Sequence, residues 1–540
     1  MRCVKQVLIF AVLLMLSCLV QAGYLTPDLQ AKLDQASPDD KLKVIVRMAD
    51  EADISVFPQG QRAVMVQHLK DFASRRQKNL LATLPRYGDK VSHIKPFWIY
   101  NGIALEATKE VVLDLAKRSD VGYVEEDKVI RLEDTEVGSY PGFNTIGWNI
   151  TKIKADSVWG VLGYTGQGIV VGNIDTGVMV THETFGGRWR GGRNSWFDAV
   201  WGDSVPYDDN GHGTGVMGVI CGGSTAETIG VARGATFVCA KAFDSFGQGY
   251  TSWIDACYQW IASLGNSVPQ VVNHSWSTGS QTDPHFWQES RNLQVMGLHQ
   301  SYAIGSGGPG HGTAHAPASY PHLIGVGATD ASDNLLPGSA RGPVPDSFGA
   351  RESTLNYLDP NWAASRRKPD LSAPGVNIRT AYNDGGYNSL SGTTFSTPHV
   401  AGVIALMLQK NPDLTDKQIW QILASTCDTF SWGGPYPNQD YGWGRLNAYR
   451  AVMATPPSGM AEEAARSTVS CLPFSIRPNP FTSFATVPGH PTDRFALYDV
   501  SGRKVGVYRG DRIGADVPPG VYFLRPIGQA YKPLRVVKIR

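Results

Sequence analysis

Residues 168–177 read Gly-Ile-Val-Val-Gly-Asn-Ile-Asp-Thr-Gly. An apolar run of this length, bounded by glycines, is typical of a buried strand, and an acid stands at its end before a turn. Similar strands alternate with helix-like segments from about Trp148 to Val452, which predicts an α/β fold around a parallel sheet. Functional residues of such sheets lie at the carboxyl ends of strands, so Asp175 is a candidate site residue.

Two other segments of this region carry polar residues suited to catalysis. Residues 210–215, Asn-Gly-His-Gly-Thr-Gly, place His212 between glycines at the start of a predicted helix. The glycines allow close backbone approach and leave the ring able to act as a general base and then as an acid. Residues 391–402, Ser-Gly-Thr-Thr-Phe-Ser-Thr-Pro-His-Val-Ala-Gly, place Thr394 at the start of an apolar helix that ends near Lys410. The amides of that helix start supply half of an oxyanion hole.

Each segment also has an ordinary explanation. An acid after a strand is usually a turn or N-cap residue, and threonine at a helix start is usually a cap. A histidine beside a glycine is common. The three segments indicate a hydrolase site only in combination, as the orienting acid, base and nucleophile of an activated hydroxyl.

In this order the segments resemble the subtilases: the acid in Ile-Asp-Thr-Gly, the base in Gly-His-Gly-Thr and a nucleophile box that ends Pro-His-Val-Ala-Gly. The resemblance also takes in residues 272–276, 316–321, 368–375 and 441–447. The motifs Asn-x-Ser-Trp and Gly-Gly-Pro-Gly most resemble those of the bacillopeptidase F-like branch. The resemblance implies that Asp175 orients the base, His212 is the base and Thr394 stands in the nucleophile position.

The resemblance also implies roles for neighbouring residues. The substrate residue before the cut is expected to contact a pocket lined by Ser275, Trp276 and Ser277. Three other histidines that fit the family pattern are interpreted as structural: His182, His274 and His399. A metal pair of His311 and His315 is disfavoured, because their glycine-rich loop holds no carboxylate at close spacing.

Two departures from the family pattern bear on activity. Thr394 replaces the serine of Gly-Thr-Ser, and Ser306 replaces the asparagine that donates to the oxyanion. The β-methyl of threonine restricts χ1, and a misplacement of ~1 Å costs ~10²-fold in rate. Losing one oxyanion donor costs ~10²–10³-fold. Ser396 is no substitute, because two positions along a helix it points about 200° away. Two hypotheses follow: a secreted endopeptidase with a threonine nucleophile, or a pseudoprotease that binds polypeptide without cleaving it.

The length of 540 residues predicts several domains. The charge is nearly balanced, with 49 Lys and Arg against 48 Asp and Glu, and gives no reason to expect nucleic acid or an anionic membrane as partner.

We expect a signal peptide at 1–22, where Arg2 and Lys5 precede an apolar run that ends in small residues. Lipidation of Cys18 is the alternative. No other stretch reaches the length of a membrane span. The further boundaries are an α+β domain at 23–140, a peptidase domain at 141–453, a linker at 454–470 and a β-sandwich at 471–540.

The N-terminal α+β domain is expected to place helices on an antiparallel sheet. Its predicted strands are 44–46, 97–106 and 121–124, and its predicted helices are 62–84 and 109–117. It resembles the inhibitory propeptide of subtilases, which is removed by self-cleavage. The scissile bond is expected between Arg131 and Trp148.

The C-terminal block holds short alternating runs at 494–498 and 520–524, which predict the β-sandwich. It resembles the sorting domain of type IX secretion, and a generic β-sandwich appendage is the alternative. The chain is therefore expected to be secreted or held at a bacterial cell surface. The expected partners are protein or peptide substrates, its own propeptide and secretion machinery.

Two bulk features concern cofactors and cysteines. The resemblance implies chemistry without a cofactor and allows structural calcium at an unknown site, for which residues 208–210, Asp-Asp-Asn, are a candidate; a solvated acidic loop is the alternative. Five cysteines follow the signal, an odd number, and the simplest interpretation is small buried hydrophobes: Cys221, Cys239, Cys257, Cys427 and Cys471.

Overall fold

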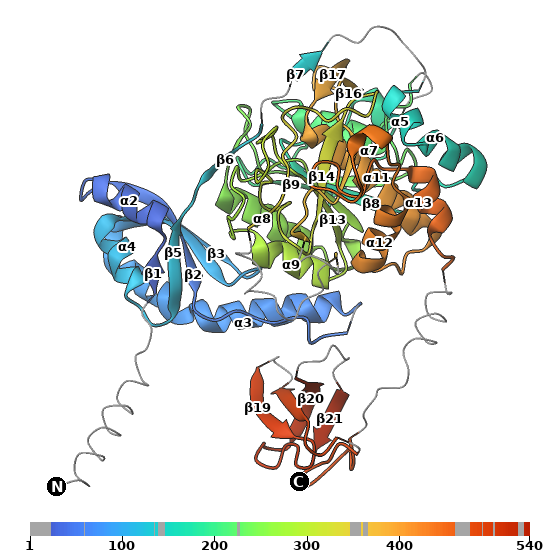
Figure 1. Cartoon of the computed structure of the whole chain (residues 1–540). Coiled ribbons are helices and arrows are strands. Elements are labelled where there is room, and N and C mark those ends of the chain that lie inside the picture. The colour runs from blue at the N-terminus through green and yellow to red at the C-terminus, as the bar shows by residue number, and fades with distance from the viewer. Residues whose placement is uncertain are drawn as a thin grey trace, which may run out of the picture. The chain divides into compact units, whose positions relative to one another are not determined.

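The computed structural model divides into two compact units (Figure 1): Met1–Ala52 with Leu69–Lys128, and Asp53–His68 with Val129–Arg540. The residues that the structure describes are 23–58, 60–133, 136–138, 146–223, 227–345, 358–359, 365–458, 476–488, 490–499, 503–527 and 534–539. The expected signal peptide, most of the expected linker and Cys471 lie outside these residues. In the described part of the chain, no helix combines the length and apolar character needed to cross a membrane.

The second unit is built on a seven-stranded sheet in the order β15-β14-β13-β12-β8-β10-β9, in which neighbouring strands pair in parallel. The strands are β8 (Val170–Asp175), β9 (Trp196–Asp198), β10 (Thr236–Lys241), β12 (Val271–His274), β13 (His299–Ala303), β14 (Ile324–Thr329) and β15 (Leu371–Pro374). Strands β12 to β15 are buried along their whole length, as expected of a parallel sheet covered on both faces. The predicted α/β fold is confirmed.

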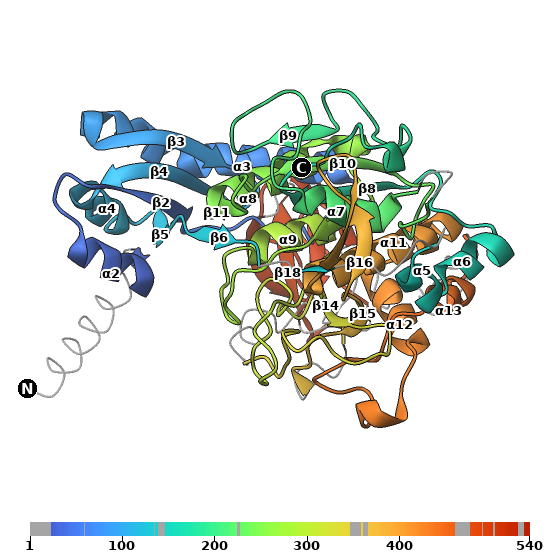
Figure 2. The same cartoon turned by 90° about the horizontal axis from the view of Figure 1, so that it is seen from above.

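Two buried helices position the candidate catalytic residues. Helix α7 (His212–Cys221) is buried on all sides, and α11 (Thr393–Lys410) is buried except at its last residues. They pack against each other, and α11 also packs against β12 to β15; Figures 1 and 2 show the pair beside the sheet. The other helices of this unit are α5 (Trp148–Lys152), α6 (Ala155–Ser157), α8 (Thr251–Ser263), α9 (Trp287–Val295), α12 (Asp416–Thr426) and α13 (Ala448–Ala454). Short helical turns are η3 (Val158–Leu162), η4 (Glu183–Phe185), η5 (Gly265–Ser267) and η7 (Ser431–Gly433).

The strand order reverses beside β8. The chain passes from β8 to β10 on one side and then to β12 on the other, so β8 lies between them. Asp175 ends β8 in register with Lys241 of β10, and His274 ends β12. A crevice forms outside the carboxyl ends where strand order reverses, which is where the candidate residues are found.

Two small sheets of the same unit hold the segment that leads into the central domain. Strand β6 (Val129–Arg131) pairs antiparallel with β11 (Gln248–Tyr250). Strand β7 (Glu136–Gly138) pairs antiparallel with β17 (Tyr387–Ser391), which also pairs with β16 (Ile378–Ala381). The residues just before and just after 134–135 are therefore held by different parts of the central domain.

The first unit contains a five-stranded sheet in the order β1-β5-β2-β4-β3. Its elements are β1 (Tyr24–Leu25), α2 (Pro27–Gln35), β2 (Lys41–Met48), η2 (Leu84–Lys90), β3 (Val91–Phe97), β4 (Gly102–Thr108), α4 (Lys109–Ala116) and β5 (Val121–Glu126); α3 (Arg62–Thr83) begins in the range of the second unit. The sheet is antiparallel except for β1, which pairs parallel with β5. Its buried core includes Val44, Val46, Leu105, Val111 and Val124.

One predicted strand of this unit is wrong. The run 97–106 is not continuous, because β3 ends at Phe97 and β4 begins at Gly102. Asn101 in the turn between them has φ +58°, and its side-chain amide donates to the carbonyl of Asp50. Asparagine tolerates this left-handed conformation, so an Asn-Gly turn divides the run into a hairpin.

The C-terminal block contains one antiparallel sheet in the order β19-β18-β20-β21. Its strands are β18 (Arg494–Asp499), β19 (Lys504–Arg509), β20 (Gly520–Pro526) and β21 (Leu534–Lys538). Phe495, Leu497 and Leu524 of this sheet share a buried cluster with Phe481 and Ile513. Outside these strands the described residues of the block pair through isolated bridges, so the second sheet of the predicted sandwich is not confirmed.

The described cysteines match the interpretation as small hydrophobes. Four of them are buried and form no disulfide with another described residue: Cys221, Cys239, Cys257 and Cys427. Burial raises the pKa of the Cys221 thiol to about 12, which keeps it protonated and unreactive.

Candidate active site

A buried carboxylate and imidazole meet at the end of the central strand. The Nδ1 of His212 lies 2.7 Å from Oδ1 of Asp175, and the two side chains are 5% and 1% exposed. Oδ1 also accepts a hydrogen bond from the backbone N–H of Thr176. The structure thus brings together two of the three residues predicted from the sequence, in the geometry by which a carboxylate fixes the orientation of an imidazole.

Glycines on both sides of His212 make this approach possible. A Cβ added at Gly213 would lie 2.1 Å from the carbonyl oxygen of Gly177, and Gly211 has φ +104°. A larger residue at either position would push α7 away from the end of β8 or strain the backbone. The sequence argument for these glycines is confirmed.

Opposing effects set the charge of His212. Burial disfavours the protonated ring, but the charge and hydrogen bond of Asp175, with the charges of Asp208 and Glu133, together raise its pKa above the ordinary value of a histidine. A protonated imidazole is therefore stabilised at this position.

Thr394 is the second residue of α11 and is 2% exposed. Gly392 occupies the N-cap position, so the explanation of Thr394 as a helix cap is wrong. The ring of the next residue, Phe395, packs edge-on against His212 at 5.3 Å between ring centroids. Ser275 donates its hydroxyl to the carbonyl of Thr394 at 2.7 Å. The first contact holds the start of α11 beside the start of α7, and the second holds it beside the end of β12.

The hydroxyl of Thr394 and the base are not hydrogen-bonded. Nε2 of His212 is buried and has no hydrogen-bond partner among the described residues. Catalytic hydrogen bonds are often long before substrate binds, so the missing bond does not by itself rule out Thr394 as the nucleophile.

Two further polar groups of the site were missed by the sequence argument. Glu133, which follows β6, accepts hydrogen bonds at Oε1 from the backbone N–H of Ser306 at 2.8 Å and from the hydroxyl of Ser277 at 3.1 Å. Nδ1 of His315 lies 3.5 Å from the same oxygen and 3.0 Å from the Ser277 hydroxyl. The sequence signal for His315 was its position directly before the family motif at 316–321.

The three residues predicted to line the substrate pocket have different environments. Ser277 faces Glu133, but Ser275 is fully buried against α11. Trp276 is fully buried and packs against Phe286 at 5.0 Å. Its indole therefore belongs to the core, and the assignment of Ser275, Trp276 and Ser277 to the substrate pocket stays a prediction.

The histidines interpreted as structural have the contacts that this role requires. His182 accepts from the N–H of Thr184, and His399 lies 2.7 Å from the side-chain amide of Asn149. His274 stacks on Tyr302 at 4.1 Å, and burial lowers its pKa well below the ordinary value. The hydroxyl of Ser396 donates to the carbonyl of Thr393, as expected of a residue that faces away from the site.

His311 and His315 do not form a metal pair. His311 contacts the carbonyl of Gly342, whereas His315 contacts Ser277. Among the described residues, the one group of three metal-ligating side chains lies elsewhere, at Asp255, His285 and Glu289.

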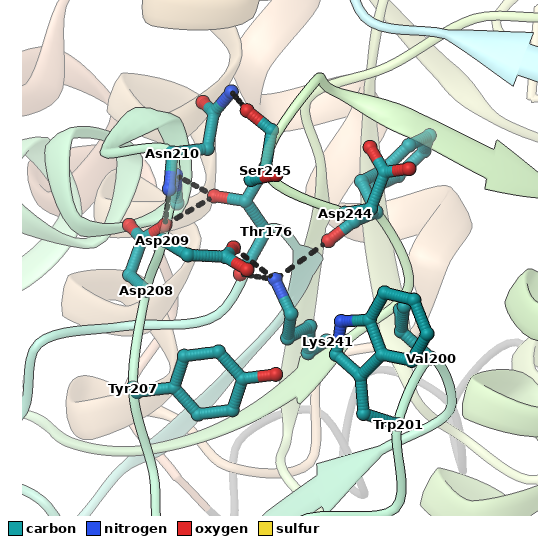
Figure 3. A network of polar contacts seen from close by, with 12 residues as sticks. Thr176, Val200, Trp201, Tyr207, Asp208, Asp209, Asn210, Lys241, Asp244 and Ser245 are labelled. Carbon is teal, nitrogen blue, oxygen red and sulfur yellow. Dashed lines mark hydrogen bonds and ion pairs between the residues drawn. The ribbon is translucent and has the colours of Figure 1, made fainter.

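Residues 208–210 do not fit a calcium ion. Oδ1 of Asp208 accepts from the backbone N–H groups of Asn210 and Gly211, and Oδ2 accepts from Thr214. Asp209 is paired with the ammonium of Lys241 (Figure 3). The carboxylate oxygens of Asp208 and Asp209 are thus already bound by hydrogen-bond donors and by the ammonium group. The alternative of a solvated acidic loop is also wrong for Asp208, which is 9% exposed.

The Lys241 ammonium joins this loop to the strand that carries the acid. Its side chain is fully buried, and Nζ donates to the carbonyls of Thr176 and Phe243, both at 2.8 Å, and to Asp209 (Figure 3). Because Thr176 follows Asp175, this amine fixes the turn after β8.

We expect Lys241→Met to lower the free energy of unfolding by about 3 kcal/mol, because it leaves an acid and two carbonyls without their donor. Urea unfolding followed by tryptophan fluorescence measures the change, with the exposed Lys417→Met as matched control. A loss of less than about 1 kcal/mol, which is the range of an exposed ion pair, contradicts the role given to Lys241.

Comparisons with known proteins agree with this geometry. The subtilase family profile matches residues 166–444. Bacillopeptidase F of Bacillus subtilis (strain 168) is 32% identical, with 79% of this chain and only 31% of that protein covered. Subtilisin E of the same strain is 30% identical, with 72% of this chain and 88% of the relative covered. A crystal structure of a cold adapted subtilisin-like serine proteinase is 31% identical and has a TM-score of 0.43, with 53% of this chain and 90% of the other covered. The family match over more than half of the chain, together with the identity to subtilisin E over most of that protein, shows that the chain belongs to the subtilase family.

Proposed function

We propose that the chain is a secreted endopeptidase whose triad is Asp175, His212 and Thr394. The observation that carries the proposal is the buried contact of 2.7 Å between Asp175 and His212, beside the start of α11. An acid and imidazole in this arrangement serve to activate a hydroxyl.

The mechanism follows from these positions. His212 takes the proton of the Thr394 hydroxyl as its oxygen attacks the scissile carbonyl, and Asp175 stabilises the imidazolium. The amides at the start of α11 and the Ser306 position stabilise the oxyanion. His212 then returns the proton to the leaving amine, and a water molecule releases the acyl group.

The flanking segments have proposed roles in the same scheme. Residues 1–22 are a signal peptide, 23–140 an inhibitory propeptide-like domain, 454–470 a linker and 471–540 a sorting domain for secretion. The extended strand β6 supports the second of these roles, because it enters the central domain directly beside Glu133 and the candidate site.

A pseudoprotease is the second candidate. Three observations favour it: Thr394 and Ser306 replace the family residues, and Nε2 of His212 has no hydrogen-bond partner among the described residues. Such a protein keeps the cleft and its strand β11 for binding extended polypeptide without cleavage.

Self-processing distinguishes the two candidates. We expect the full chain, expressed in a protease-deficient host, to yield a new N-terminus between Arg131 and Trp148, and we expect Asp175→Ala and Thr394→Ala to prevent this cut. N-terminal sequencing makes the measurement, and Thr393→Ala is the matched control. A chain that begins at Gly23 in every variant contradicts the peptidase and supports the binding protein.

A further inference from the structure

Residues 129–133 lie along the central domain as an extended peptide. Strand β6 adds to β11 in antiparallel register, with Arg131 opposite Gln248, and the N–H of Leu132 donates to the carbonyl of Gly247 at 2.8 Å. Ile130 is 4% exposed, whereas Val129 and Arg131 are exposed. Sheet edges bind extended peptides in this way: the two main chains pair, and every second side chain of the peptide enters a pocket.

The next side chain in this peptide, Glu133, is held by three polar groups. Its Oε1 accepts from the N–H of Ser306 and from the hydroxyl of Ser277, and Nδ1 of His315 lies 3.5 Å away. The side chains of Glu133 and His315 are only 15% and 16% exposed. The contacts come from the loop after β12 and the loop after β13, so the sheet itself holds this carboxylate pocket, defined by Ser277, Ser306 and His315.

The chemistry of the carboxylate pocket favours an anion. An ionised carboxylate is an acceptor only, and hydrogen bonds to it are stronger than those to a neutral amide. A phenylalanine in the same place removes the carboxylate acceptor of these donors, and a lysine places a cation against them. The pocket therefore distinguishes glutamate from the apolar, amide and basic side chains.

The position of Glu133 matches that of the residue before a cut. The loop after β12 contacts both Glu133 and the nucleophile position: Ser277 donates its hydroxyl to Glu133, and Ser275, two residues earlier, donates to the carbonyl of Thr394. On the other side, Glu136 begins β7 and pairs with Ser391, three residues before Thr394.

We propose that the carboxylate pocket makes this cleft selective for glutamate before the scissile bond, and that the chain cuts itself between Glu133 and Asp134. The inference rests on the proposed peptidase function. In this step the carbonyl carbon of Glu133 forms an ester with Thr394 as its bond to the nitrogen of Asp134 breaks, and the amine leaves with the proton carried by His212. One water molecule then hydrolyses the ester, which gives a C-terminal carboxylate at Glu133 and restores the hydroxyl.

Peptides test the selectivity. Fluorogenic substrates Val-Ile-Arg-Leu-Xaa-Asp, with Xaa as Glu, Gln, Phe or Lys, are incubated with the processed Thr394→Ser chain. We expect kcat/KM for Glu to exceed that for Gln by about tenfold or more. His315→Ala and Ser277→Ala are expected to lower the rate on the Glu peptide about tenfold and to leave the Phe peptide within about threefold. Equal rates for Glu and Gln overturn the selectivity.

Processing tests the position of the cut. We expect Asp134 as the new N-terminus of the full chain and an approximately tenfold slower appearance of it in Glu133→Gln. Glu51→Gln changes an exposed glutamate and is the matched control. A different N-terminus, or equal processing rates in Glu133→Gln and the control, overturns this part of the inference.

Limited proteolysis by trypsin, which needs no activity of the chain itself, separates this inference from the proposed function. If the Thr394→Ser chain cleaves none of the four peptides and stays unprocessed, the peptidase proposal fails while the carboxylate pocket is still testable. In the unprocessed Thr394→Ala chain, trypsin cleavage after Arg131 requires release of β6, and we expect Glu133→Gln to accelerate it about tenfold. An unchanged trypsin rate, relative to Glu51→Gln, overturns the pocket.

Discussion

The Thr394→Ser variant is expected to hydrolyse peptides with a kcat about 10²-fold above that of the parent chain. Thr394 is 2% exposed, and its backbone is fixed by Ser275 on one side and by α11 on the other. The β-methyl therefore cannot move aside as the substrate carbonyl approaches, and it limits the rotation that brings the hydroxyl to Nε2 of His212. Serine keeps the nucleophile and removes both restrictions.

Steady-state kinetics on one peptide gives the comparison, with kcat and KM measured separately. Thr393→Ser removes the same methyl group from the preceding buried residue and is the matched control, for which we expect little change in kcat. If Thr394→Ser leaves kcat at the parental value, Thr394 does not stand in the nucleophile position.

Asp175→Asn in the Thr394→Ser chain is expected to lower kcat about 10⁴-fold. Oδ1 of Asp175 holds Nδ1 of His212 in a site where both side chains are buried, so no water replaces the lost acceptor. An asparagine can present its amide to the ring and stabilise the wrong tautomer, and it offers no charge to the imidazolium.

The same variant is expected to change the pH profile. His212 must be unprotonated to act as base, so activity falls as the pH decreases through its pKa. Asp175 raises that pKa, so its replacement moves the acid limb of kcat/KM to lower pH. Asp413→Asn alters an exposed acid and serves as control. An unchanged acid limb together with retained activity rules out Asp175 as the orienting acid.

Much of the site could be predicted because its chemistry is local to short segments. Asp175 ends an apolar strand, and His212 lies between glycines, so their environments are evident within a few residues of sequence. The strand order of the sheet then brings the two together, as expected for a parallel α/β fold.

The residues that were missed depend on long-range contacts. Glu133 and His315 are far apart in the sequence, although their side chains lie 3.5 Å apart in the structure. The residues next to each of them in the sequence do not indicate this contact. Trp276 was assigned to a pocket by resemblance to the family, which does not fix the direction of its side chain. The indole is buried against Phe286 and Tyr302, where a large aromatic ring gains from burial. The hairpin at Asn101 is different, because an Asn-Gly pair is itself a turn signal.

The four buried thiols determine how this domain responds to oxidants. Each lies in the closed interior, and burial raises the pKa values of Cys221, Cys239 and Cys427. A thiolate reacts with an alkylating or oxidising reagent, whereas a buried protonated thiol must first be uncovered. The rate at which such a reagent modifies these thiols therefore measures how often the interior opens. In an oxidising environment, these thiols are oxidised only at that rate.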